Sequence, residues 1–184
     1  MTPDRARLRL FAALELPPAA VAALEAFRDR AADPAVWRPL PAASLHVTLA
    51  FLGATDAGRV GELTAALEAA AGPAPLLELG GALLLPPRRA RVLCATLADG
   101  QGRLAALQAR VSEELAATGA YAPEARPFRA HVTVARLRHG ARCGAVGRRV
   151  SARFEVQEVV LARSVTHPGG ARYETLGRWP ARRR

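Results

Sequence analysis

The chain carries the same short pattern twice, and this repeat constrains its fold more than any other feature. The pattern is His46-Val47-Thr48 and then His131-Val132-Thr133, and each copy lies in a mostly apolar run. In a β-strand, residues two apart point to the same face, so each histidine emerges beside its threonine and the valine points the other way. The copies lie about half of the 184-residue chain apart. This spacing predicts two related halves with one such strand in each.

Hydrophobic periodicity and turn residues place the other elements. The clearest helix has its apolar stripe on Leu104, Leu107, Val111 and Leu115. Asp56 is expected to cap the helix before it. Strands are expected at 7–16, 44–53, 76–85, 90–97, 128–137, 153–162 and 172–179, helices at 19–32, 59–71 and 101–118, and a loop or short helix at 140–147.

The order of these elements predicts an α+β protein made of two related lobes. Each half supplies a helix followed by a His-Val-Thr strand, and a pseudo-two-fold axis between the halves brings the two marked strands together beside a cleft. With 51% hydrophobic residues the chain can build a sizeable core. We therefore expect residues 1–184 to form a single bilobal domain, whose strand order the repeat does not specify.

Composition narrows the range of partners. The chain has 26 basic and 16 acidic residues, a net charge of +10 and no lysine. Such a charge favours polyanions, of which nucleic acid is the commonest. Cys94 and Cys143 are too few for a disulfide scaffold and have no metal-ligand spacing. We find no signal-peptide pattern and no apolar run of membrane-spanning length, so we expect a cytoplasmic protein without a membrane partner.

Two imidazoles that face one cleft, each beside a hydroxyl, suit in-line phosphoryl transfer without metal. One neutral histidine accepts a proton from the attacking oxygen, and the other, protonated, donates to the leaving oxygen. The threonine hydroxyls donate to phosphate oxygens. A lone histidine on a strand is more often structural, but packing alone does not require the same frame twice. His139 and His167 are expected at the surface and in a turn.

The two motifs resemble the paired His-x-Thr-x motifs of the two-histidine phosphoesterase superfamily. The residues around the two motifs are also similar to those of a known family. They are Arg9 to Ala13 followed by Leu16-Pro17-Pro18 before the first motif, and Arg126 to Arg129 before the second histidine. This context resembles the RNA 2′,3′-cyclic phosphodiesterases once described as 2′-5′ RNA ligases, over essentially the whole chain. The resemblance implies a bilobal, pseudo-two-fold duplicated α+β fold, with antiparallel sheets flanking a central groove and helices on the outer faces.

The resemblance also implies hydrolysis of a terminal 2′,3′-cyclic phosphate of RNA to a 2′-phosphomonoester, without metal or other cofactor. In that scheme His46 is the proton donor and His131 the proton acceptor, while Thr48, Thr133 and Arg136 bind the substrate. Strict alternation puts Arg136 on the face opposite His131, so its role requires a bulge, a twist or a strand end. A monomer is the expected state.

Two other functions remain open alongside this one, and so do the roles of several residues. Ligation of a cyclic phosphate to a 5′-hydroxyl uses the same residues, and a groove that only grips phosphate makes the protein an RNA-binding module. Trp37 and Arg38 are placed in an exposed loop, where the aromatic ring either stacks a base or meets solvent. Arg129 either lines the groove or meets solvent, and a cluster at Arg88, Arg89 and Arg91 either follows an RNA backbone or forms an exposed loop.

Overall fold

The computed structural model of the protein describes residues 6–143, 146, 151–156, 158–167 and 170–180. Within them, nine strands form one sheet, and three α-helices pack on it. The helices are α1 (Pro18–Ala31), α2 (Val60–Ala69) and α3 (Arg103–Ala117). The strands are β1 (Arg7–Glu15), β2 (Trp37–Pro39), β3 (His46–Asp56), β4 (Leu76–Leu85), β5 (Val92–Ala98), β6 (His131–Leu137), β7 (Arg153–Glu155), β8 (Glu158–His167) and β9 (Gly170–Pro180).

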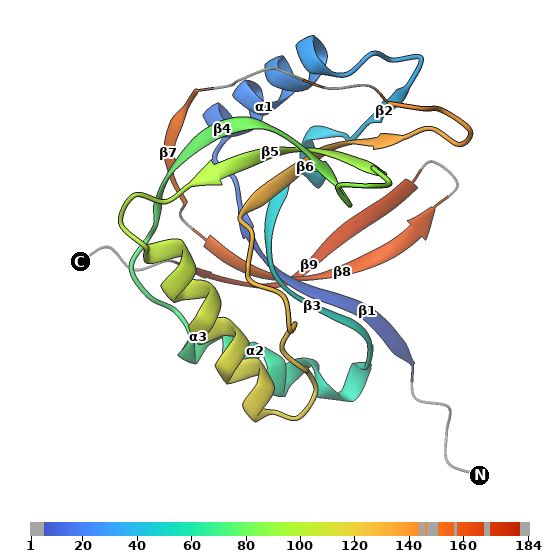
Figure 1. Ribbon diagram of the computed structural model, residues 1–184. Helices are drawn as coiled ribbons and strands as arrows, with labels where there is room; N and C mark the ends of the chain where they lie inside the picture. Colours follow the sequence, from blue (N-terminus) through green and yellow to red (C-terminus); the bar gives the residue numbers. More distant parts are fainter. Residues whose placement is uncertain (1–5, 144–145, 147–150, 157, 168–169, 181–184) are drawn as a thin grey trace.

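The sheet is antiparallel and consists of two halves. Its strand order is β7-β4-β5-β6-β3-β1-β8-β9, with β2 added beside β6. The halves join where β3 pairs with β6 through a single residue pair, Val47 with Val132. Figure 1 shows the sheet curling around this join. The expected α+β fold with two pseudo-symmetric antiparallel halves is thus confirmed, with the marked strands as the central neighbours.

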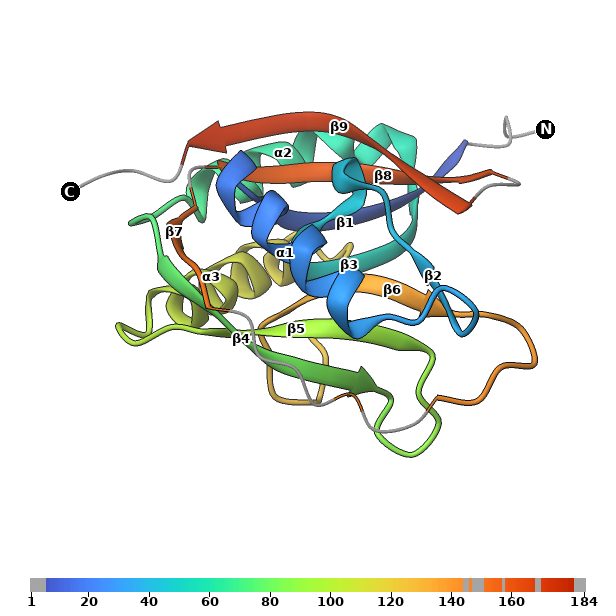
Figure 2. The ribbon, with the colours of Figure 1, turned by 90° about the horizontal axis from the view of Figure 1, so that it is seen from above.

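The helices cover the outer faces of the curled sheet. In Figures 1 and 2, α2 and α3 lie together against the half that contains β3, β8 and β9, whereas α1 lies against the other half. Helix α3 buries the predicted stripe of Leu104, Leu107, Val111 and Leu115 completely or nearly so. Each such leucine contributes roughly 2 kcal/mol by leaving water. The helices therefore hold the sheet in its curled shape from outside and leave its inner face open.

Two sequence expectations for this architecture are wrong. The single strand expected at 153–162 is two strands, because β7 pairs with β4 in one half whereas β8 pairs with β1 in the other. Trp37 is not in an exposed loop: it begins β2, pairs with Leu137 and is only 2% exposed in the main core. Of the loop or short helix expected at 140–147, residues 140–143 and 146 are described and contain no helix, and the others lie outside the described residues.

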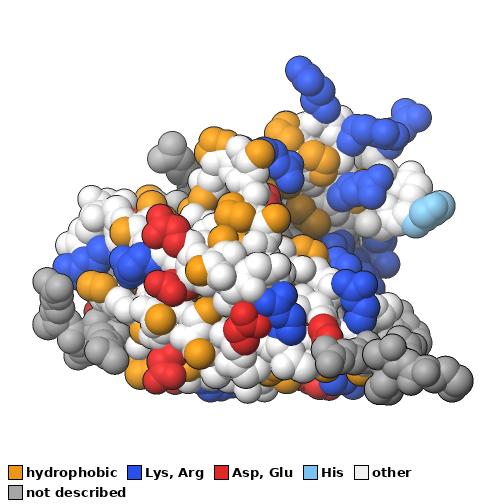
Figure 3. Space-filling view, turned by 90° about the horizontal axis from the view of Figure 1, so that it is seen from below, with side chains coloured by type: hydrophobic (Ala, Val, Ile, Leu, Met, Phe, Trp, Pro, Cys, Tyr) orange, Lys and Arg blue, Asp and Glu red, His pale blue; other side chains and the backbone are white. Residues whose placement is uncertain are grey.

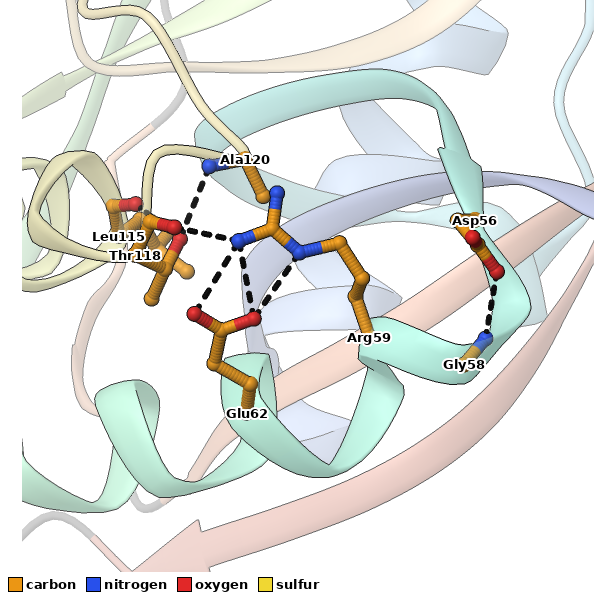
Figure 4. Close-up of polar contacts among 7 residues, drawn as sticks. All are labelled: Asp56, Gly58, Arg59, Glu62, Leu115, Thr118 and Ala120. Atoms are coloured by element: carbon orange, nitrogen blue, oxygen red, sulfur yellow. Dashed lines mark hydrogen bonds and ion pairs between the residues drawn. The ribbon is translucent and has the colours of Figure 1, made fainter.

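A polar cluster fixes the ends of α2 and α3 to each other (Figure 4). The Asp56 carboxylate accepts a hydrogen bond from the Gly58 N–H at 2.8 Å, so the expected cap stabilises the 3₁₀ turn that leads into α2. Arg59 forms an ion pair with Glu62 and donates to the Thr118 carbonyl at the end of α3. The Thr118 hydroxyl accepts from the Ala120 N–H at 3.1 Å. This cluster fixes the point from which the chain runs on towards β6.

Candidate active site

The two His-Val-Thr frames come together in one groove. Val47 and Val132 are fully buried, so the flanking histidines and threonines point to the opposite, inner face. Continued by one residue, the antiparallel register sets His46 opposite Thr133 and Thr48 opposite His131. The groove encloses about 460 Å³. Its lining residues are Arg9, Phe11, Arg38, Leu40, Ser44, His46, Thr48, Phe51, His131, Thr133, Arg136, Ser164, Thr166, Ala171 and Tyr173.

Each of the two imidazoles is fixed by a hydrogen bond of the same kind. Nδ1 of His46 lies 2.9 Å from the carbonyl oxygen of Ser44, and Nδ1 of His131 lies 2.6 Å from that of Arg129, in each case two residues upstream. A carbonyl only accepts, so Nδ1 carries the hydrogen in both rings. This bond fixes the tautomer and leaves Nε2 of each neutral ring as a base. The two halves therefore present two equally oriented imidazoles.

Matching bulges change the phase of both central strands just after the threonines. Between β3 and β1, Thr48 pairs with Ala13 and Ala50 with Ala12, so Leu49 has no partner. Between β6 and β5, Val134 is skipped in the same way. Each bulge leaves two consecutive buried residues and returns the next side chain, Phe51 or Arg136, to the inner face. The bulge that Arg136 requires is present, and Arg136 lines the groove.

The groove is positively charged. Arg9, Arg38 and Arg136 line it, and no Asp or Glu is among its described lining residues. Arg38 pairs directly with Arg136 across β2 and β6, which sets two like charges side by side. The Arg9 guanidinium lies 4.6 Å above the Phe51 ring, and both side chains are exposed. Figure 3 shows basic side chains gathered most densely toward one side of the molecule. Such a groove favours phosphate groups.

His46 is in the more enclosed environment of the two histidines. Its ring centroid lies 4.9 Å from that of Phe11 and 5.1 Å from that of Tyr173, the latter in an edge-on arrangement. Burial lowers the pKa of His46 from 6.5 to about 4, helped by the charges of His131 and Arg136 and opposed by the Ser44 hydrogen bond. In the free protein His46 is therefore neutral at pH 7.

Several other candidates fall outside the groove. Arg129 lines an adjoining cavity of about 800 Å³ that also touches Thr48, Phe51 and His131. The side chains of Arg88, Arg89 and Arg91 are exposed, and none is among the described residues that line the groove. Cys94 lies behind Thr133, 3.5 Å from its hydroxyl, and burial raises the pKa of its thiol to about 11. Cys94 is thus a core thiol and no nucleophile.

Sequence patterns missed part of the groove lining. Ser164 on β8 pairs with Tyr173 on β9, and both reach the groove because their hairpin lies beside β1. No local pattern predicts that either residue lines the groove, because only the long-range pairing of β1 with β8 brings them there. The described part of the chain contains no group of three or more His, Cys, Asp or Glu side chains placed to hold a metal ion. None of its helices meets the length and apolarity that a membrane span requires.

Comparison with protein families places this chain in a known family. The family model of the 2′-5′ RNA ligase superfamily matches residues 16–168, a segment that includes both His-Val-Thr frames. This chain belongs to the 2′-5′ RNA ligase superfamily. The expected place among the two-histidine phosphoesterases is thereby confirmed for the family as a whole. No curated protein matches the sequence.

Solved structures of the superfamily's fold cover nearly the whole chain. TT0787 of Thermus thermophilus is 26% identical, with a TM-score of 0.85 over 96% of this chain and 99% of that one. E. coli LigT complexed with 3′-AMP is 28% identical, with a TM-score of 0.82 over 95% of this chain and 98% of LigT. A structure described as a phosphoesterase is also 28% identical, with a TM-score of 0.82, covering 95% and 98% of the two chains.

Proposed function

We propose that this protein hydrolyses the 2′,3′-cyclic phosphate at an RNA end to a 2′-phosphomonoester, by acid–base catalysis with two histidines and without a metal ion. The observation that carries the proposal is the pair of matched imidazoles, each fixed through Nδ1 to a carbonyl and each lining the same groove. A groove with three arginines and no carboxylate among its described lining residues suits an anionic substrate.

In the reaction, Nε2 of His131 takes a proton from water as the oxygen attacks phosphorus. The P–O3′ bond breaks, and the departing O3′ receives a proton from His46, so the phosphate stays on O2′. Thr48, Thr133 and Arg136 donate hydrogen bonds to the non-bridging oxygens, whose charge shifts during the attack. Proton exchange with solvent returns both imidazoles to their starting states.

His46 must gain a proton before it can act as the acid, because it is neutral in the free protein. A bound phosphodiester supplies a negative charge beside the ring, and a neighbouring opposite charge raises the pKa of an imidazole. Binding of the substrate is therefore coupled to uptake of a proton by His46. This coupling keeps the enclosed ring uncharged until its partner anion is present.

Relatives support a nucleotide substrate. E. coli LigT has been solved with 3′-AMP, with ATP, with NADP+ and with phosphate. The description of the family as the 2′-5′ RNA ligase superfamily favours RNA over other phosphodiesters as the substrate class.

Ligation is the second candidate, favoured by one observation. The adjoining cavity beside His131 is large enough for a nucleoside whose 5′-hydroxyl replaces the attacking water. The same residues then form a 2′-5′ linkage as the P–O3′ bond breaks. Water is far more concentrated than any RNA end, so hydrolysis is expected to dominate.

The test uses an oligonucleotide with a 2′,3′-cyclic phosphate, incubated with the protein in EDTA, and ³¹P NMR of the product. A 2′-phosphomonoester is expected. His46→Ala and His131→Ala should each slow turnover by about 10²- to 10⁴-fold, the usual contribution of one proton transfer, while RNA affinity changes little. His139→Ala, on an exposed residue, is the matched control. Normal turnover in either groove variant refutes the mechanism, and RNA binding without turnover by the unmodified protein favours an RNA-binding module.

A further inference from the structure

A second cavity lies beside the His46 ring and is set apart from the phosphate groove in its chemistry. It encloses about 400 Å³ between β1, the start of α1, the turn before β3, and strands β8 and β9. The two spaces share three rings, those of Phe11, His46 and Tyr173, whose centroids lie about 5 Å from one another. The groove and the cavity therefore border each other at these rings.

The floor of this cavity is apolar. Ala13, Val160 and Ala162 form with Phe11 a buried cluster that is separate from the main core, and Tyr173 packs against it. Alanine is a poor strand former, and its small side chain leaves space above the sheet. Ala22 on α1 contributes a further small residue to the wall. The result is an apolar hollow beside a catalytic ring, a shape that suits a flat ring system.

The charges that line this cavity are opposite in sign to those of the groove. Glu15 and Glu25 line it, and no arginine is among its described lining residues. Glu15 uses Oε2 in its ion pair with Arg178, and Glu25 uses Oε1 at 3.5 Å from Arg28, so each has a second oxygen. Carboxylates repel phosphate but accept hydrogen bonds from amino groups, as they do from the N4 amino group of cytosine.

We propose that this cavity binds the nucleobase of the terminal nucleotide, whose phosphate lies in the groove, and that Glu15 and Glu25 select bases with an exocyclic amino group. The proposal rests on the proposed function, because it assigns the base of that same substrate. Cytosine, adenine and guanine carry such a group. Uracil presents a carbonyl oxygen at the position of the cytosine amino group, and that oxygen faces carboxylates unfavourably.

Cytidine and uridine 2′,3′-cyclic monophosphates give the sharpest comparison, because they differ at the amino position of the base. We expect kcat/KM to favour the cytidine nucleotide by about tenfold, the equivalent of one well-placed hydrogen bond. Glu25→Gln should reduce this preference, since an amide can donate to the uracil carbonyl. Equal kcat/KM for the two nucleotides overturns the selective role of the carboxylates.

Occupancy of the cavity is tested separately by filling it. Ala22→Phe places a large ring in the wall from an exposed position of α1, and Ala26→Phe places the same ring one turn further on, outside the described cavity residues. We expect Ala22→Phe alone to raise KM for the cytidine nucleotide about tenfold. Identical KM values for the two variants overturn the proposal.

A binding measurement distinguishes this proposal from the proposed function. The dissociation constant of cytidine 3′-monophosphate, measured by calorimetry, requires no catalysis. If the protein turns over no cyclic phosphate but Ala22→Phe still weakens this binding and Ala26→Phe does not, the base site stands and the proposed reaction falls. If cyclic phosphate is hydrolysed but both variants bind and react equally, the base site falls and the reaction stands.

Discussion

The enclosed position of His46 predicts a specific dependence of stability on pH. In the unfolded chain its imidazole takes up a proton as the pH falls through about 6.5, but in the folded protein it does so only near pH 4. Between these values the unfolded state binds more protons, so the free energy of unfolding falls as the pH falls, by up to about 1.4 kcal/mol per pH unit. The loss reaches roughly 3 kcal/mol by pH 4 and is absent above pH 7.

Urea unfolding of the protein and of His46→Asn between pH 4.5 and 8 measures this loss. Asparagine does not titrate, and its side-chain N–H can still donate to the Ser44 carbonyl. All other titrating groups are shared, so the difference between the two stability curves isolates His46. His139→Asn, on an exposed residue, is the control and should follow the unmodified protein. Parallel curves for the unmodified protein and His46→Asn refute the claim that burial holds this ring neutral.

Three further predictions concern the surroundings of the groove. Arg136→Ala should raise KM for a cyclic phosphate about tenfold to a hundredfold, as loss of a charged hydrogen bond does, whereas Arg138→Ala, outside the groove lining, should not. Gln108→Leu removes the donor to the Leu49 carbonyl at the β3 bulge, 3.3 Å away, and should cost about 1 kcal/mol in urea unfolding; an unchanged midpoint contradicts this. In the native protein a thiol reagent should modify the partly exposed Cys143 and spare Cys94; equal modification of both means that Cys94 is not enclosed.

The sequence was most informative where its pattern is local. Strand alternation places His46 and Thr48 on one face, and the repeat places His131 and Thr133 beside them, because identical frames in related halves meet at the join. The bulges were not predictable, since Leu49 and Val134 are ordinary strand residues and only the pairing shows that each is skipped. Arg136 could therefore be proposed only on condition of a bulge.

Other parts of the site depend on which distant strands pair. Tyr173 reaches His46 because β9 follows β8, which lies beside β1. The segment that contains Trp37 is rich in proline and charge, as a loop is, but β6 has an open edge that accepts three residues as β2. Residues 153–162 show one strand-like pattern although their two parts join opposite halves of the sheet. Hydrophobic periodicity predicts where a strand lies and which of its faces is buried, but it does not predict which other strand pairs with it.

In the proposed reaction two histidines have different tasks at one phosphorus centre, and a change of the leaving atom tests this division most directly. In an oligonucleotide whose cyclic phosphate has sulfur in place of O3′, the thiolate leaves without needing a proton. We predict that the loss of about 10²- to 10⁴-fold in His46→Ala nearly disappears with sulfur, whereas the loss in His131→Ala persists. An equal loss in His46→Ala with oxygen and with sulfur, or a recovery in both variants, contradicts the assignment of the acid and the base.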